Sequence, residues 1–199
     1  MDISRSFSHM FKDSSWFFKV FIGGMFLTMS IVVVGLPFIL GYEIEHIRHV
    51  AQRQDSMLPE WKNMRRIFEE GLTVFLAAFV YTAMILALIV AVNGALTMYS
   101  VVFATLAVVF FLMPLVFIQY SKRPSFFSCF SLPEILKRCA LHPLLYAISL
   151  VTGFLTIAAT ILFGWMSIIL GWPFVVFWGI LVQSHILGQL AEVNQRSVR

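Results

Sequence analysis

Charged residues are scarce in this sequence. Two long stretches, 71–121 and 139–191, contain no aspartate, glutamate, lysine or arginine. Only 12% of all residues are charged, against about 25% in a soluble domain. A charge at the centre of a bilayer costs roughly 2.5–3.5 kcal/mol on insertion scales, so lipid demands such a deficit, whereas a packed soluble domain does not. The sequence therefore indicates an integral membrane protein.

Cysteine is also scarce, and catalytic motifs are missing. The two cysteines, Cys129 and Cys139, lie in or beside a basic segment, where we expect small thiols and no disulfide. They have neither the CxxC spacing nor the nearby histidine pair of a metal site. The chain contains no phosphate-binding loop, nucleophile elbow, HExxH or dinucleotide fingerprint. Because no acid–base pair is visible at membrane depth either, we expect the protein not to be an enzyme.

The net charge of +4 resembles that of a nucleic-acid binder, but its distribution does not. The basic residues lie in the segments between the apolar runs, as the positive-inside rule predicts. We interpret them as a topology signal that also attracts anionic lipid headgroups. The expected partners are therefore the lipid bilayer and other membrane-protein subunits, and not nucleic acid.

The apolar runs have the length of membrane-spanning helices. A helix rises about 1.5 Å per residue and a bilayer core is about 30 Å thick, so one pass takes roughly 20 residues. Each charge-free stretch is long enough for two passes, with turns at Asn93-Gly94 and around 164–173. Together with an apolar segment over 16–42, they predict one all-α transmembrane domain, 1–199, a polytopic helical bundle. Its five spans are expected at roughly 17–41, 71–92, 95–119, 143–163 and 168–189.

The first apolar segment allows two topologies, because Gly35-Leu36-Pro37 interrupts it. Proline lacks an amide hydrogen and clashes with the preceding helical turn, so a kink or a break is expected there. One kinked helix can span the membrane. Alternatively, the chain spans over 16–34 and folds back at Gly35–Pro37, which makes six segments and draws Glu43 and His46 toward lipid depth. Since charges at that depth are costly, the single kinked helix is the favoured prediction.

Three short amphipathic helices are expected on the membrane surface. The first, about 4–14, places Phe7, Met10 and Phe11 on one face at helical spacing, while His9 and Asp13 point elsewhere.

The second surface helix is expected over about 59–70, with Pro59 in its first turn and Trp61 as its anchor. It contains two i, i+4 pairs, Arg65–Glu69 and Arg66–Glu70. The third is expected over about 132–139, opened by the capping-box spacing of Ser131 and Glu134.

The basic residues also predict an orientation. The loop at 43–70 has five lysines and arginines, the loop at 122–138 has four, and the tail after 191 has two. With five spans these three segments share one side, which we expect to be the cytoplasmic side of the inner membrane. Arg5, Lys12 and Lys19 would then lie outside, a conflict that a folded-back first segment would remove.

Histidines supply the candidate site residues. His185 lies in an apolar helix beside Gln183, Ser184 and Gln189, where an ionisable group is by default a functional hypothesis. It could ligate a haem or chlorophyll metal or relay protons, or it could be structural, so the cofactor stays unknown.

A second group, His46 and His49 with Glu43 and Glu45, could hold a metal. These four side chains do not all lie on one face of a helix, so no metal site is predicted there.

Several motifs together resemble a known family. They are Trp16 after a short polar lead, Ile22-Gly23-Gly24, Gly41-Tyr42, Leu58-Pro59-Glu60-Trp61, Ile67-Phe68-Glu69-Glu70-Gly71, His142-Pro143 and Gly188-Gln189. In this combination the chain resembles the bacterial and archaeal domain-of-unknown-function family 4013. The loop after Trp61 departs from that family, since it carries Lys62, Arg65 and Arg66 where acidic residues are common. The resemblance implies a multi-pass membrane protein of unassigned function and supplies no catalytic residues.

Two functional hypotheses follow. The leading one is a non-enzymatic scaffold or accessory subunit that acts through helix–helix contacts, because intramembrane polar groups are few and Phe, Met and Gly are abundant. The alternative is a small transporter or a lipid- or solute-binding protein. That alternative predicts a polar cavity formed by Gln183, Ser184 and His185 with Asn93 or Thr97.

Overall fold

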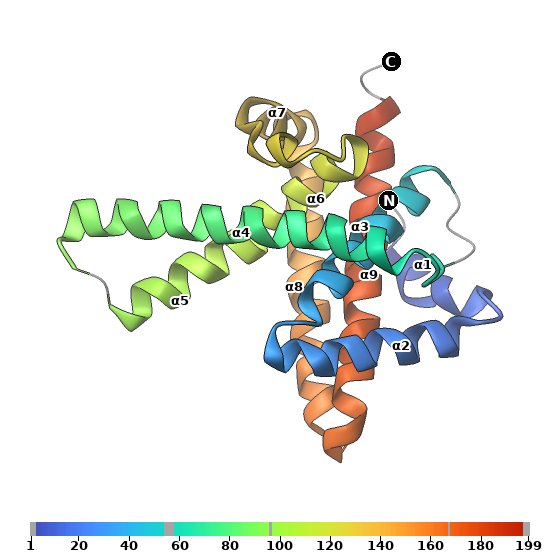
Figure 1. Cartoon of the computed structure of the whole chain (residues 1–199). Coiled ribbons are helices and arrows are strands. Elements are labelled where there is room, and N and C mark those ends of the chain that lie inside the picture. Colours follow the sequence, from blue (N-terminus) through green and yellow to red (C-terminus); the bar gives the residue numbers. More distant parts are fainter. Residues whose placement is uncertain (1–2, 54–57, 96, 167, 197–199) are drawn as a thin grey trace.

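The structure, a computed structural model, describes residues 3–53, 58–95, 97–166 and 168–196. Every regular element in those residues is helical, which confirms the predicted all-α class (Figure 1). The α-helices are α1 Ile3–Ser8, α2 Trp16–Met29, α3 Leu36–Ala51, α4 Met64–Asn93, α5 Met98–Ala107, α6 Met113–Lys122, α7 Leu132–Leu141, α8 Pro143–Met166 and α9 Ile168–Arg196. Shorter 3-10 or π turns are η1 His9–Lys12, η2 Ser30–Val32, η3 Val108–Leu112 and η4 Phe126–Phe130.

Four helices of the described chain are long and apolar enough to cross a membrane, which makes this a membrane protein. They cover Met64–Val92, Met98–Lys122, Pro143–Thr160 and Gly171–Gln195, and so overlap the last four predicted spans. A fifth crossing results if Ser4–Lys12 and Trp16–Val32, which are bent by 107° at their junction, form one broken span.

Helix α3 lies at the centre of the molecule, packed between α4 and α9. Its apolar face is fully buried at Ile44 and Ile47. The sequence placed these residues in a polar loop because of their charged neighbours. The structure buries this apolar face in the core, while the ion-pair network of α3 is formed by Glu45, Arg48 and His49.

The single helix predicted over 17–41 is wrong. Helix α2 ends at Met29, and the left-handed backbone of Val33 (φ 68°) reverses the chain before α3 begins. As a result the Trp61 ring stacks on Tyr42 in α3 while its indole nitrogen donates to the carbonyl of Lys19 in α2. A straight helix would separate Lys19 from Tyr42 by about 35 Å. The chain therefore folds back at Gly35–Pro37, as the alternative topology predicted.

The first predicted surface helix differs from expectation in Met10, which belongs to the predicted membrane-facing side but is buried in the protein. In α1 and η1 the polar Ser6 and His9 are buried in the protein, whereas Phe7 and Phe11 are exposed. Asp13, which follows, is also buried and pairs with Lys19 at 2.7 Å. Periodicity identified two opposite faces but could not tell which one meets the rest of the chain.

The other two surface helices also differ from prediction. Residues 58–63 are not helical, and the Pro59 carbonyl in this segment accepts a hydrogen bond from the Tyr42 hydroxyl. Residues 64–70 form the beginning of the long helix α4. Within α4 both predicted i, i+4 ion pairs form. At α7 the capping box does not form, because Glu134 accepts hydrogen bonds from Gln119 and Arg123 instead of returning to Ser131.

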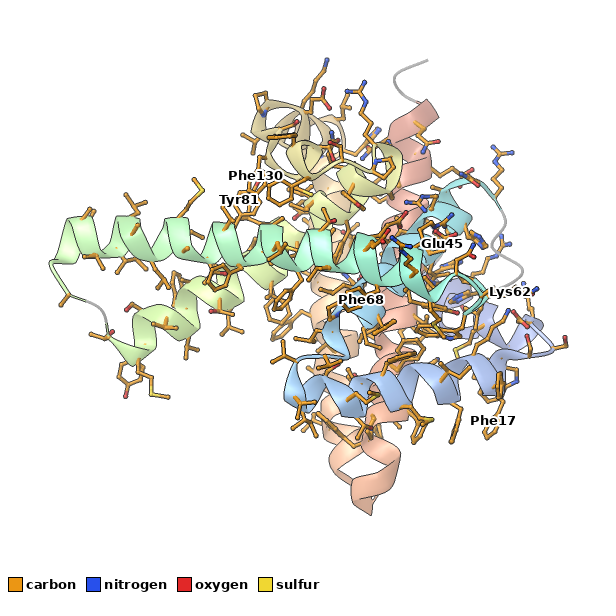
Figure 2. All side chains as sticks on the ribbon, in the orientation of Figure 1. Phe17, Glu45, Lys62, Phe68, Tyr81 and Phe130 are labelled. Atoms are coloured by element: carbon orange, nitrogen blue, oxygen red, sulfur yellow. The ribbon has the colours of Figure 1, made fainter. Side chains whose placement is uncertain are left out.

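Side chains also fix the position of the second polar loop. The Tyr81 ring lies beside Phe130 in Figure 2, and the Tyr81 hydroxyl donates to the Cys129 carbonyl at 2.7 Å. Cys129 is a buried free thiol; the side chain of Cys139 lies outside the described residues. By contrast, Phe17 in α2 is 69% exposed, as expected for a side chain that meets lipid.

Candidate functional site

An apolar groove of about 700 Å³ lies between the α4–α5–α6 arm and α8–α9, with α3 at its floor. In Figure 1 the arm projects sideways across the direction of α8 and α9, so the two hairpins diverge. The groove has the volume of an ordinary small-ligand pocket, which is roughly 300–1,000 Å³. Its walls are aliphatic and aromatic, with residues such as Phe75, Phe110, Leu150 and Phe154.

Four polar side chains line this groove: Glu43, Thr82, Thr105 and Gln183. Thr82 is satisfied by its own helix, since its hydroxyl donates to the Ala78 carbonyl at 2.9 Å. Glu43 is only 8% exposed, and burial raises the pKa of its carboxyl to about 8. Gln183 lines the same groove from α9, and its buried carbonyl oxygen accepts no hydrogen bond from the described residues.

A second polar cluster lies behind the groove, where three histidines from distant parts of the chain meet. The His9 ring stacks on His185 with centroids 4.0 Å apart and on His46 with centroids 5.1 Å apart. His9 belongs to η1, His46 to α3 and His185 to α9. All three side chains are at least 98% buried.

The hydrogen bonds of the cluster fix its tautomers. His9 Nδ1 lies 2.8 Å from the Ser6 carbonyl, which can only accept, so Nδ1 carries the proton. His9 Nε2 then accepts from His46 Nε2 at 3.1 Å. The remaining His46 nitrogen, Nδ1, lies 2.6 Å from the Ser184 hydroxyl oxygen, which also lies 3.0 Å from the Leu181 carbonyl oxygen. Burial, with further contributions from the neighbouring imidazoles, lowers the pKa of His46, which favours this neutral chain.

His185 completes the cluster through its Nδ1 atom. Ser6 Oγ lies 2.8 Å from that nitrogen, and the Gln189 amide nitrogen lies 3.0 Å from it. An amide nitrogen only donates, so His185 Nδ1 is an acceptor. The cluster therefore holds the N-terminal segment against α9 with neutral, directional bonds.

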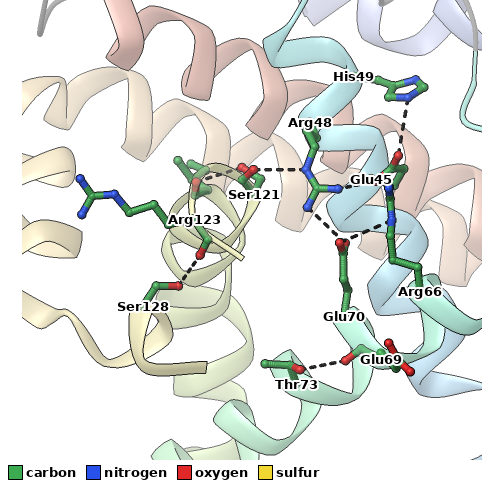
Figure 3. Close-up of polar contacts among 11 residues, drawn as sticks. Glu45, Arg48, His49, Arg66, Glu69, Glu70, Thr73, Ser121, Arg123 and Ser128 are labelled. Carbon is green, nitrogen blue, oxygen red and sulfur yellow. Dashed lines mark hydrogen bonds and ion pairs between the residues drawn. The ribbon is translucent and has the colours of Figure 1, made fainter. Parts of the chain in front are cut away.

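An ion-pair network, shown in Figure 3, joins α3 to α4 and α6. Arg48 bonds to Glu45 in its own helix, to Glu70 at 3.2 Å and to the Ser121 carbonyl at 3.3 Å. Arg66 adds a further pair to Glu45. These charges neutralise one another, so the network positions the floor of the groove and is not itself a free binding site.

Comparison with known proteins gives one family. The family DUF4013, described as a protein of unknown function, matches residues 24–171. This chain belongs to the DUF4013 family. No curated protein and no solved structure matches the chain. In this DUF4013 protein the matched range contains Glu43, His46 and the groove walls from α4 to α8, and it ends at the start of α9.

The structure separates the predicted site residues of the DUF4013 protein. Ser184 and His185 join the histidine cluster, while Gln183 lines the groove. Thr97 is exposed at the tip of the α4–α5 hairpin, where it caps α5, and so does not join them; the side chain of Asn93 lies outside the described residues.

The metal hypothesis for His46, His49, Glu43 and Glu45 is wrong in its geometry. His46 faces the cluster, Glu43 faces the groove, and His49 lies 3.8 Å from Glu45 at the polar edge. Across the described residues no three His, Cys, Asp or Glu side chains are arranged to hold a metal ion.

Sequence reasoning missed two residues of the DUF4013 protein. His9 was assigned to the polar face of a surface helix, yet it contacts residues 37 and 176 positions away, which no local pattern encodes. Glu43 was mentioned as a loop charge and as a weak metal ligand. A signal for it existed, since it lies one turn before His46 on the apolar face of α3.

Proposed function

We propose that this DUF4013 protein binds one amphipathic, lipid-like molecule in the groove between its α4–α6 arm and α8–α9. The observation that carries the proposal is the groove itself, with apolar walls and two buried polar groups, Glu43 and Gln183, at its inner surface. A binding site for a ligand with an alkyl chain and a small polar head has this composition.

The dimensions favour a lipid chain over a helix from a partner protein. A helix is about 10–12 Å wide, so a 700 Å³ groove would hold less than two turns of one. The surrounding helices α4, α5, α6 and α8 belong to candidate membrane spans, so the ligand can enter from the bilayer without crossing water.

A photoreactive probe tests the proposal. A sixteen-carbon chain carrying a diazirine, incorporated in nanodiscs with the purified protein, should crosslink to groove residues such as Phe75, Phe110 and Leu150. Ala78→Trp, which adds bulk inside the groove, should reduce this labelling at least fivefold. Leu88→Trp, on an exposed position of the same helix, is the matched control and should not change it.

Uniform labelling would contradict the proposal. If exposed lipid-facing positions such as Phe103 crosslink as strongly as the groove, and Ala78→Trp has no effect, the groove does not select the probe.

The scaffold or accessory role predicted from the sequence stays a prediction. The exposed apolar side chains of α2, α4 and α5, for example Phe17, Phe79 and Phe103, suit lipid contact as well as a partner helix. We further propose that the loop at 43–70, the segment 122–138 and the C-terminus face the cytoplasm across the inner membrane. Their excess of lysine and arginine supports that orientation.

A further inference from the structure

Glu43 differs from the other buried or half-buried carboxyl groups on α3 and its neighbours. Asp13 pairs with Lys19, whereas Glu45 and Glu70 belong to the Arg48 network. Glu43 has no hydrogen bond or ion pair with any described residue, although its side chain is buried. A buried carboxyl without a partner is costly to keep, so its position in the wall of a groove calls for a reason.

Gln183 repeats this anomaly from the opposite helix. Its carbonyl oxygen is buried and accepts no hydrogen bond from the described residues. The side chain lies against Gly153 of α8, where an added Cβ would overlap the Gln183 amide. The backbone of α8 therefore leaves room for this amide, which lines the same groove as Glu43.

We infer that Glu43 and Gln183 bind the head of the groove ligand, and that this head is a hydrogen-bond donor, a primary amine or a hydroxyl. The inference rests on the proposed function and specifies its ligand class. The Gln183 oxygen can only accept, and a carboxyl group accepts in either protonation state. Both groups that line the groove can therefore accept a hydrogen bond, which favours a ligand head that donates one.

The groove also excludes an anionic head. None of its lining residues is lysine, arginine or histidine, so a phosphate or carboxylate would be buried without a cation. An amine would instead form an ion pair with ionised Glu43. A hydroxyl would donate to the Gln183 oxygen and accept from protonated Glu43.

Three fourteen-carbon competitors that differ only in their heads test the inference: tetradecylamine, tetradecanol and tetradecanoate. Each is titrated over a range of mole fractions into the wild-type protein in nanodiscs, and displacement of the diazirine probe is measured. The amine and the alcohol should compete at a concentration at least tenfold lower than the carboxylate.

Two variants assign the preference to its residues. Glu43→Gln keeps a carbonyl acceptor but cannot ionise, so amine competition should weaken about tenfold while alcohol competition persists. Gln183→Met removes the second acceptor and should weaken both. Thr28→Val is the matched control, because Thr28 lies in α2 outside the groove and its hydroxyl bonds to its own helix, and it should leave the ranking unchanged. Equal elution and melting behaviour of each variant shows that it is folded.

The outcomes separate the two proposals. If the probe labels the groove but tetradecanoate competes as well as tetradecylamine, or the ranking survives both variants, the head-group inference is overturned and lipid binding stands. If the wild-type groove is not labelled at all, both are overturned.

Discussion

At the scale of single residues, burial decides what each polar group of this protein does. His9 and His46 hydrogen bond to each other, His46 to Ser184 and His185 to Ser6, so the cluster ties the N-terminal segment to α3 and α9. Glu43 is buried to the same degree but bonds to nothing described, so its burial is a cost. Glu43 and His46, which lie one turn apart in α3, thus have opposite effects on the stability of the fold.

That cost predicts a pH dependence. Glu43→Gln should raise the apparent melting temperature of the ligand-free protein, and more at pH 8 than at pH 5. The unfolded chain ionises Glu43 near 4.5, whereas the folded protein keeps the proton until about pH 8. Stability of the wild type therefore falls across that window, by up to about 1.4 kcal/mol per pH unit, and glutamine removes this term.

Thermal unfolding in detergent at pH 5, 6, 7 and 8 measures the effect. The groove walls of α4, α5, α6, α8 and α9 place no other ionisable side chain beside Glu43, while Tyr42, Glu45 and His46 adjoin it on α3. Glu60→Gln, at an exposed site, is the control and should give a nearly flat difference. A pH-independent difference for Glu43→Gln would show that its carboxyl does not titrate in this range.

At the scale of elements, close backbone contact sets how α3 crosses its neighbours. An added Cβ at Gly41 would overlap the Ile67 carbonyl oxygen of α4, and one at Gly71 would overlap the Pro37 carbonyl oxygen of α3. Gly188 of α9 lies similarly against Val50. Small residues let helices approach where side chains would hold them apart. The floor of the groove depends on these crossings.

Gly71→Ala is therefore expected to destabilise the protein. The methyl group would meet backbone, which cannot rotate away, and overpacking of this kind typically costs about 1–3 kcal/mol. The variant should show a clearly lower apparent melting temperature in detergent. Ala87→Leu adds more atoms to the same helix at an exposed position and is the control. Equal melting temperatures for Gly71→Ala and the wild type would mean that α3 and α4 do not cross as closely as described.

At the scale of the whole molecule, the fold gathers its polar segments at one end. Ser6 contacts His185 and Gln189 near the polar end of α9, and Arg53 pairs with Glu192 at 2.7 Å. In Figure 1 the N-terminus lies beside the upper part of α9, toward the C-terminus. Because the first segment folds back, the basic N-terminal residues no longer oppose the basic loops.

This arrangement predicts a common side for the N-terminus and the basic loops. In a chain with Cys129 and Cys139 replaced by alanine, Ser4→Cys and Lys62→Cys should react with an impermeant maleimide from the same face of the membrane. Thr97→Cys, at the exposed tip of the α4–α5 hairpin, should react from the opposite face. Labelling in right-side-out and inverted vesicles distinguishes the faces. Reaction of Ser4→Cys from the side of Thr97→Cys would restore a single crossing by the first segment.

The amino-acid sequence by itself determined the class of this protein. Long runs without charge have no alternative to lipid, and their length and turn residues located α4, α5, α6, α8 and α9 to within seven residues. Local chemistry also gave the two ion pairs of α4, since partners four residues apart meet in any helix.

Only the tertiary structure decided which faces meet. The reversal after Val33, the burial of His9 and the presence of Glu43 and Gln183 in one groove all depend on the packing of residues far apart in the chain. In lipid, an apolar face is equally suited to the bilayer and to another helix, so hydrophobicity does not choose between them. Backbone clearance and directional hydrogen bonds make that choice, and they exist only once the helices are packed.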